Sequence, residues 1–450
     1  MDVGARLVRD YEDGAGVGGS GPVDWPDPGQ YLAATLPVWG LAAGSVRAFT
    51  AAAGRYRQAT GTAPIRHRLD PERIAASFTS DRLLRIDGAP VDGFADLSGF
   101  FPTFDGWVRT HANYPHHRAR LLAALELPED APVALAEAQM AVIRAADLEE
   151  LAAARGAIAV RVRDEAQWRA SPQAGAAGAG PLVALVERAD RSRYTVPLSG
   201  TPYQPLQGVR VLDLTRVIAG PVATRALALL GAEVLRVDPP RIPEIPWQFI
   251  DTGQGKHSTL LDLRAATAQW EGLLDSADVL VTGYRPGALE RLGLTGRPGL
   301  VHARVSAWGF TGPWAGRRGF DSIVQAASGI AVIEGASAMP GALPAQALDH
   351  ASGYLLAAGV VDALAARSAD GRGRDVRVSL ARTATWLLSE RGRTPDHPAP
   401  AVPGSRATVT HGRIVTAAPA LAEFPDYPFP ATGYGRAEPH WAEKPVAEHS

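Results

Sequence analysis

The sequence predicts an α/β protein built on an open, doubly wound parallel sheet, with a smaller α/β domain beside it. From residue 208 onward, short apolar runs rich in β-branched residues alternate with helical stretches. The strand-like runs are "GVRVLDL", "EVLRV", "STLLDL", "DVLVTGY", "LVHARVSAW" and "RDVRVSL". Helices of about 10–15 residues between short buried strands are typical of βαβ units, which build parallel sheets.

The first half of the chain divides by composition. Residues 1–69 are expected to hold a Gly-, Pro- and Asp-rich loop or disordered segment over 11–30 and an apolar helical stretch over about 31–57. Residues 70–170 mix short strands such as "GWVRTH" with helical runs such as "HHRARLLAALEL". This mixture predicts the smaller α/β domain.

The second half begins with a connection. The low-complexity run "SPQAGAAGAGP" indicates a linker over 171–205. Residues 206–390 are expected to form the sheet domain, with two late helices over about 321–334 and 350–368. Residues 391–450 are rich in proline and aromatic residues and are expected to wrap over the surface as an extended tail.

Composition excludes several classes of protein. The 450-residue chain has a formal net charge of −2, so no global field favours nucleic acid or an acidic membrane as a partner. It has no cysteine, which excludes disulfides, a catalytic thiol and thiolate metal sites and fits a reducing compartment. We find no apolar run long enough for a membrane span and no secretory pattern, so a cytoplasmic location is expected.

Two short patterns carry little functional information. Gly14, Gly16 and Gly19 fit G-x-G-x-x-G, but no strand precedes them, so we do not expect them to bind phosphate. The spacing of His111, His116 and His117 fits no zinc pattern on a helix face, and a proline interrupts it. No metal site is therefore expected.

Ligand-binding groups are expected at the carboxyl ends of the strands, where helix N-termini direct their amides at anions. The first such turn is "LDLTRVIAGPVAT", where Gly220 permits a tight turn and Pro221 suits the start of a helix. The further glycines of a dinucleotide fingerprint are missing. Six arginines at the ends of these units either form a phosphate-binding rim or are ordinary surface residues: Arg216, Arg264, Arg285, Arg291, Arg317 and Arg318.

Asp349 stands at the front of the second late helix and has two interpretations. Aspartate is a preferred N-cap residue and contributes about 1 kcal/mol in that role. The same position is expected to keep a carboxylate ionised, through the helix dipole and the amide donors. An ionised, sequestered carboxylate can attack a thioester carbonyl and form a covalent acyl-enzyme. The residues alone favour neither interpretation.

Seven blocks from residues 208–389 carry a resemblance to a known family: "GVRVLDLTRVIAGP", "LGAEVLRVD", "GKHSTLLDLR", "ADVLVTGYRPGALERLGL", "VSAWGFTGPWAGRRGFDSIVQAASG", "ALDHASGYLLAAGVVDALAAR" and "GRGRDVRVSLARTATWLL". In this order they resemble the class III CoA-transferases, the CaiB/BaiF-like family of carnitine and formyl-CoA transferases that also includes α-methylacyl-CoA racemase. The resemblance implies a Rossmann-like, CoA-binding catalytic domain over 206–390. It also implies an enzyme that moves CoA between an acyl-CoA and a carboxylic acid.

The resemblance further assigns residues by motif position. It implies that Asp349 is the nucleophile and that coenzyme A, carried on the substrate, is the cofactor, with no metal. The contacts to CoA would come from Ile218, Ala219, Leu261, Arg264, Gly283, Tyr284, Arg285, Arg291 and Arg318. The substrate pocket would be lined partly by Trp308, Phe320 and Tyr354, which suggests an apolar acyl group larger than formyl. Family members form interlocked dimers, so a homodimer is expected.

Two departures from the family leave alternatives open. The racemase branch carries a G-H-D motif that here reads Gly319-Phe320-Asp321. A racemase needs two opposed acid/base groups, so transfer is favoured over epimerisation of a 2-substituted acyl-CoA. A segment resembling the family's small domain also precedes the Rossmann-like half, as in a tandem family protein whose first Rossmann-like part has been largely lost or in a natural rearrangement. That order keeps a non-catalytic acyl-CoA-binding subunit as a further alternative.

Overall fold

The computed structural model describes residues 2–21, 23–192, 200–288, 296–336 and 338–441, and the predicted α/β class is confirmed. The central sheet has seven strands in the order β6-β12-β11-β10-β7-β8-β9. Six of them are parallel: β7 (Arg210–Leu214), β8 (Glu233–Asp238), β9 (Lys256–Leu260), β10 (Val279–Thr282), β11 (Val301–Ser306) and β12 (Arg372–Ser379). The edge strand β6 (Ala184–Arg191) pairs antiparallel with β12.

The strand order reverses between β7 and β10, which creates the switch point of a doubly wound sheet. The chain runs from β7 through β8 to β9 on one side, then returns to β10 and continues through β11 to β12 on the other. The central strands are buried along nearly their whole length, as expected for parallel strands covered on both faces.

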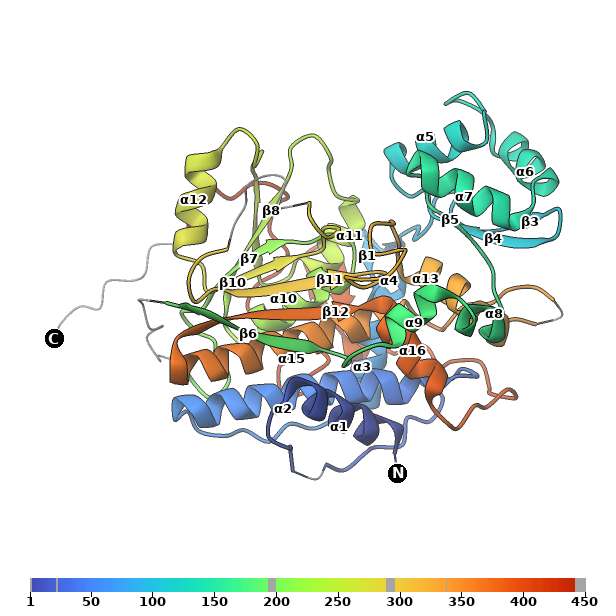
Figure 1. Cartoon of the computed structure of the whole chain (residues 1–450). Helices are drawn as coiled ribbons and strands as arrows, with labels where there is room; N and C mark the ends of the chain where they lie inside the picture. Colours follow the sequence, from blue (N-terminus) through green and yellow to red (C-terminus); the bar gives the residue numbers. More distant parts are fainter. Residues whose placement is uncertain (1, 22, 193–199, 289–295, 337, 442–450) are drawn as a thin grey trace.

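Helices stack in layers beneath the sheet (Figure 1). The long helix α15 (Ala347–Asp370) packs against α10 (Ala219–Leu229) and β12, and α2 (Val38–Thr60) packs on its other side. The helix α1 (Val3–Ala15) covers α2. The predicted loop over 11–30 therefore begins only after a helix, and Gly16 is the left-handed residue that ends it. The remaining helices of the sheet domain are α11 (Pro246–Thr252), α12 (Thr267–Asp275), α13 (Asp321–Ser328), α14 (Ile330–Ile333) and α16 (Leu380–Ser389).

A smaller body lies over the carboxyl edge of the sheet, at the upper right of Figure 1. Its antiparallel sheet is formed by β3 (Phe100–Thr103), β4 (Gly106–Thr110) and β5 (Ala159–Arg161), and its helices are α5 (Pro115–Ala124), α6 (Val133–Val142) and α7 (Ala145–Arg155). These elements share a hydrophobic cluster that extends from Leu97 to Ala159. The compact body thus starts later than the boundary at residue 70 that the sequence predicts.

The segments before and after this body pack elsewhere. The helices α3 (Pro71–Phe78) and α4 (Ser80–Leu83) contact α2 and β14, respectively. The strands β1 (Arg85–Ile86) and β2 (Ala89–Pro90) join β13 (Thr408–His411) and β14 (Ile414–Ala417) in a four-stranded sheet. The predicted tail therefore contains a hairpin. Beyond it the chain runs along β9, where the amide of Ala437 donates to the carbonyl of Ser258.

The predicted linker is partly regular. The helices α8 (Glu165–Arg169) and α9 (Pro172–Gly178) precede β6, and the low-complexity run supplies α9. Ser171 accepts a hydrogen bond from the amide of Ala174 at the start of α9, and a proline follows at the first helical position. The composition of this run predicts a linker and does not reveal these capping residues. Within the described ranges, no helix is both long and apolar enough to cross a membrane.

Candidate active site

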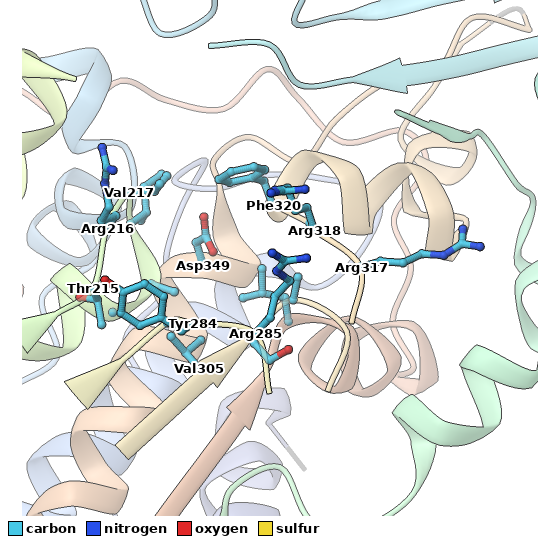
Figure 2. Close-up of a pocket in the computed structure, with 18 of the residues that line it drawn as sticks. Thr215, Arg216, Val217, Tyr284, Arg285, Val305, Arg317, Arg318, Phe320 and Asp349 are labelled. Carbon is cyan, nitrogen blue, oxygen red and sulfur yellow. The ribbon is translucent and has the colours of Figure 1, made fainter. Parts of the chain in front are cut away.

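A cavity of about 300 Å³ lies at the switch point, over the carboxyl ends of β7, β10 and β11 (Figure 2). Its floor comes from the turns after these strands, and its far wall comes from the loop before α13 and from Asp349 on α15. Three residues at the start of α5 close it from the smaller body: Tyr114, His116 and His117. The chain's own small domain therefore covers the strand ends.

The first βα turn is tightly built. Gly220 leaves no room for a side chain, since a Cβ there would lie 2.3 Å from Cβ of Thr215. Val217 adopts a positive φ of 71°, which is strained for a β-branched residue. The buried carboxylate of Asp213 holds the turn by accepting from the Thr215 amide at 2.8 Å and from Lys256 Nζ at 3.2 Å. This network positions Ile218 and Ala219 at the cavity.

Asp349 lies in the first turn of α15, which packs closely against the start of α10. One turn later, a Cβ at Gly353 would lie 2.6 Å from the carbonyl oxygen of Ala219, so only glycine fits there. Because residues four apart share one helix face, this contact turns Asp349 toward the strand ends. Asp349 is only 6% exposed, and it lines the cavity.

Asp349 is not the cap of its helix. The N-cap residue is Gln346, which makes no side-chain capping bond. Instead, Oδ2 of Asp321, at the start of α13, accepts from the backbone amide of Asp349 at 2.9 Å. Asp321 Oδ1 accepts from the Gln325 side chain. Within the described part of the chain, no hydrogen-bond donor partners the carboxyl of Asp349 itself.

This arrangement corrects the expectation that the helix N-terminus keeps Asp349 ionised. Burial first, and the nearby Asp321 carboxyl second, raise the pKa of Asp349 well above its usual range. Burial likewise raises the pKa of Asp321 to about 6, although the amide donors it accepts oppose the shift. The amides that would lower the pKa of Asp349 are used by Asp321, so the neutral form of Asp349 is favoured.

The cavity has a positive wall at Arg285 and Arg318. Arg318 donates to the carbonyl of Gly156 at 2.9 Å, and Arg285 donates to the carbonyl of Gly316 at 3.3 Å. Burial, then Arg285 and Arg120, lower the pKa of Arg318 to about 10. Among the described residues neither guanidinium has a carboxylate partner, so their charge is available to an anionic ligand.

Two other arginines of the predicted rim are already paired. Arg317 bonds Glu150 at 2.9 Å and points away from Asp349 in Figure 2. Arg216 lies 3.5 Å from Glu244 and stacks on the ring of Tyr114. Arg264 is exposed and does not line the cavity, and Arg291 lies outside the described residues.

The smaller body is attached beside the cavity by a buried polar cluster. Tyr114 donates to Glu244, which also accepts from Arg236 at 2.8 Å and from the amide of Val217 at 3.1 Å. Burial disfavours the charge, but Arg236 and Arg216 outweigh it and lower the pKa of Glu244 to about 2. Local sequence patterns do not indicate this cluster, because Tyr114 lies 130 residues from Glu244 along the chain.

Histidines of the smaller body surround Phe320. The ring of His111 stacks on that of Phe320 with centroids 3.8 Å apart and planes within 8°. Burial, followed by nearby cations and histidines, lowers the pKa of His111 to about 3 and of His117 to about 2, so both rings are neutral. The described residues contain no group of three or more His, Cys, Asp or Glu side chains placed to hold a metal ion.

The structure thus brings together most of the residues that the resemblance assigns. Those that line the cavity are Ile218, Ala219, Gly283, Tyr284, Arg285, Arg318, Phe320 and Asp349. Besides Arg264, three other described residues do not line it. Leu261 is buried beside β9, Trp308 packs against Trp168 and Trp314 and donates to the carbonyl of Arg318, and Tyr354 bonds Ser77 and stacks on Phe78. The expectation of an apolar acyl pocket loses two of its three residues.

Comparisons with known proteins agree on one family. Residues 206–416 match the model of CoA-transferase family III. A probable fatty acyl-CoA transferase of Mycobacterium tuberculosis is 35% identical over 215 residues, which are 43% of this chain and 55% of that protein. A formyl-CoA:oxalate CoA-transferase of Escherichia coli is 30% identical over 197 residues, 39% of this chain and 47% of that protein.

A succinyl-CoA–L-malate CoA-transferase alpha subunit of Chloroflexus aurantiacus is 31% identical over 222 residues, 44% of this chain and 51% of that protein. A solved structure of a hypothetical protein from Mycobacterium tuberculosis is 35% identical and covers 41% of this chain and 57% of that one, with a TM-score of 0.39. The chain spans about half the length of these relatives.

Proposed function

Because residues 206–416 are matched by CoA-transferase family III, we propose that this protein transfers CoA from an acyl-CoA to a carboxylic acid, with Asp349 as the nucleophile. One observation carries the proposal. The buried carboxyl of Asp349 has no hydrogen-bond partner among the described residues and faces a cavity of about 300 Å³. Arg285 and Arg318, which have no carboxylate partner among the described residues, line the same cavity. A helix-capping role for Asp349 would explain none of these features.

CoA lies over the strand ends in this proposal. The amides of Ile218 and Ala219 at the start of α10 and the guanidinium groups of Arg285 and Arg318 receive its phosphates. Tyr284 lines the same wall and is 37% exposed, so its ring offers an apolar surface to the ligand. The resemblance adds Leu261, Arg264, Gly283 and Arg291, and the first two follow β9 at the same edge of the sheet.

The reaction proceeds through covalent intermediates on Asp349. Its carboxylate attacks the thioester carbonyl, which forms an aspartyl–acyl anhydride and releases the CoA thiolate. The thiolate attacks the aspartyl carbonyl, which gives an aspartyl-CoA thioester and frees the donor acid. The acceptor carboxylate then attacks this thioester to form a second anhydride and thiolate, and the thiolate takes the new acyl group and restores Asp349.

Burial serves this chemistry in two ways. The attacking carboxylate has few hydrogen bonds to break, and water that would hydrolyse an anhydride is restricted because the smaller body covers the cavity. The raised pKa of Asp349 has a cost, since only the ionised fraction of this residue can attack.

We place the enzyme in the cytoplasm, and we infer a homodimer in which the smaller body of each chain covers that chain's own site.

Two alternatives predict different results. An epimerase of 2-substituted acyl-CoA would exchange the α-proton of its substrate with solvent deuterium, and His111 next to Phe320 is the imidazole available for it. A non-catalytic binding subunit would bind CoA thioesters tightly and form no adduct. The binding-subunit alternative leaves unexplained a carboxyl that is buried in the cavity wall and has no hydrogen-bond donor among the described residues.

The proposal is tested by mass spectrometry of the intact protein after mixing with a panel of acyl-CoAs and trapping with hydroxylamine or borohydride. A modification that maps to Asp349 and is absent from Asp349→Asn supports covalent transfer. Asn preserves the shape of the side chain, so the control isolates the nucleophile. Tight CoA binding without any trapped species would refute transfer and favour the binding subunit.

A further inference from the structure

A second, smaller cavity of about 30 Å³ adjoins the first at Asp349. Val217, Ile218, Phe320 and Asp349 line both cavities. If CoA fills the larger cavity, as the proposed function requires, a thioester carbonyl at Asp349 directs its acyl group into the smaller one. A cavity needs about 10–15 Å³ to hold one water molecule, so the smaller cavity has room for about two groups of the size of a water molecule. The acyl group must therefore be short.

Side chains that line this small cavity carry buried polar atoms without hydrogen-bond partners among the described residues. Three lining side chains, from three separate elements, each bury a polar atom that lacks a hydrogen bond within the described ranges: Nδ1 of His111, Oε1 of Gln248 and Oγ of Ser322. The residues are only 4%, 5% and 6% exposed, respectively. Buried polar atoms are rarely left unpaired in proteins, so these call for an explanation.

An alkyl acyl group would leave these buried atoms without a partner. Leaving a buried polar atom without a partner is energetically unfavourable. A hydroxyl has one donor and two acceptor lone pairs, which suit an amide oxygen, a serine hydroxyl and a neutral imidazole. The ring of His111 is held in place by its stacking on Phe320.

The charges around the cavity exclude a second carboxylate on the acyl group. The carboxyls of Asp81 and Asp349 both line it, and within the described part of the chain no arginine or lysine does. Arg109 is not a lining residue, and its guanidinium stacks on the rings of Phe94 and Phe100. An anionic substituent would be buried there beside two carboxyls and without a cationic partner among the lining residues.

We propose that the acids exchanged at this site are short hydroxy acids, whose hydroxyl bonds to His111, Gln248 and Ser322. This inference rests on the proposed function and specifies its substrate class. It differs from the apolar acyl group expected from the sequence, because Trp308 and Tyr354 do not line either cavity.

The test uses four CoA thioesters with the same number of acyl carbons: lactoyl-, 3-hydroxypropionyl-, propionyl- and malonyl-CoA. For each, label exchange between the thioester and its own labelled acid is measured, so donor and acceptor are identical. At least one of the hydroxyacyl pairs should exchange with a kcat/KM at least about tenfold above those of propionyl and malonyl.

Variants connect the preference to the named atoms. Gln248→Leu and, separately, Ser322→Ala should each reduce the hydroxyacyl-to-propionyl ratio by about fivefold or more. Gln58→Leu makes the same change as the first variant at an exposed position of α2 and should leave the ratio unchanged.

Exchange of propionyl or malonyl as fast as both hydroxyacyl pairs would overturn the inference while leaving the transferase function intact. A preference for hydroxyacyl groups that neither Gln248→Leu nor Ser322→Ala reduces would also overturn it. No exchange with any of the four thioesters, together with no adduct on Asp349 in the trapping experiment, would refute the proposed function and this inference with it.

Discussion

The backbone amide of Asp349 donates to Oδ2 of Asp321 at 2.9 Å, which holds the buried carboxyl at the start of α13 beside the first turn of α15. Asp321 takes the amide donors, and Asp349 is left with burial and a neighbouring carboxyl. The helix N-terminus therefore stabilises a charge beside the proposed nucleophile and not on it. The pH dependence of both activity and stability follows from this relationship.

The acidic limb of the pH–rate profile should reflect this pair. Because Asp349 attacks as a carboxylate and its pKa is raised, kcat/KM should increase with pH, and this acidic limb should lie above the usual pKa range of an aspartate. Asp321→Asn removes the neighbouring charge but keeps an oxygen that accepts the amide. It should lower the pKa of Asp349 and move the acidic limb down by about one pH unit.

A matched control for that variant is Asp251→Asn, which changes another buried aspartate whose pKa burial raises to about 6. Asp251 bonds Ser80 and lines neither of the two cavities. Its substitution should leave the acidic limb in place. Equal shifts from the two variants would mean that Asp321 does not act on Asp349.

Asp349→Asn should stabilise the fold at alkaline pH. The folded-state pKa of Asp349 lies above its unfolded value, so its stabilising contribution is complete below the unfolded pKa and is lost as pH rises through the folded pKa. Asparagine has no charge to bury. Thermal unfolding should show a Tm gain of about 2 °C or more at pH 8 and almost none at pH 4. A gain that is equal at both pH values would contradict this account.

The arginine wall should be needed for binding CoA. Arg318→Gln and Arg285→Gln should each raise the KM for acyl-CoA by about tenfold, since a charge-assisted hydrogen bond contributes about 1.5–3 kcal/mol. Arg317→Gln is the control, because that guanidinium already pairs with Glu150. The effect of the first two variants should shrink at high salt. Equal KM values for all three variants would remove the phosphate role.

Glu244 should hold the smaller body on the sheet domain. Glu244→Gln leaves Arg236 with fewer carboxylate partners and should lower the free energy of unfolding by about 3 kcal/mol, measured in urea. Tyr114→Phe removes one hydrogen bond to the same carboxylate and should cost about 1 kcal/mol. A double-mutant cycle should show coupling between the two, and additive effects would contradict direct contact.

Much of the sheet domain could be predicted from local patterns. Its parallel strands are short, apolar and separated by helices, and their carboxyl ends bring Gly283 to Arg285 next to Ile218 by topology alone. Block order was enough to indicate the family over this region. Asp349 could be placed at the front of its helix because a long, almost wholly apolar helical run follows it in the sequence.

The features of the site that could not be predicted from the sequence depend on contacts between segments that lie far apart in the chain. The bond from the Asp349 amide to Asp321 joins residues 28 apart, and Tyr114 meets Glu244 across 130 residues. Neither hydrogen bond leaves a periodic pattern in the local sequence. Trp308 and Tyr354 were expected to line the pocket, but their polar atoms bond Arg318 and Ser77. Helix α1 was missed because its C-terminal residues are rich in Gly and Asp.

The most direct test of covalent transfer follows oxygen from the acceptor acid. In the proposed mechanism, the acceptor carboxylate leaves one of its oxygens on Asp349, and the next turnover passes that oxygen to the released donor acid. With an acceptor labelled with ¹⁸O in its carboxyl group, the peptide containing Asp349 should become labelled, and the released acid should follow. Turnover with label at neither place would contradict an aspartyl intermediate.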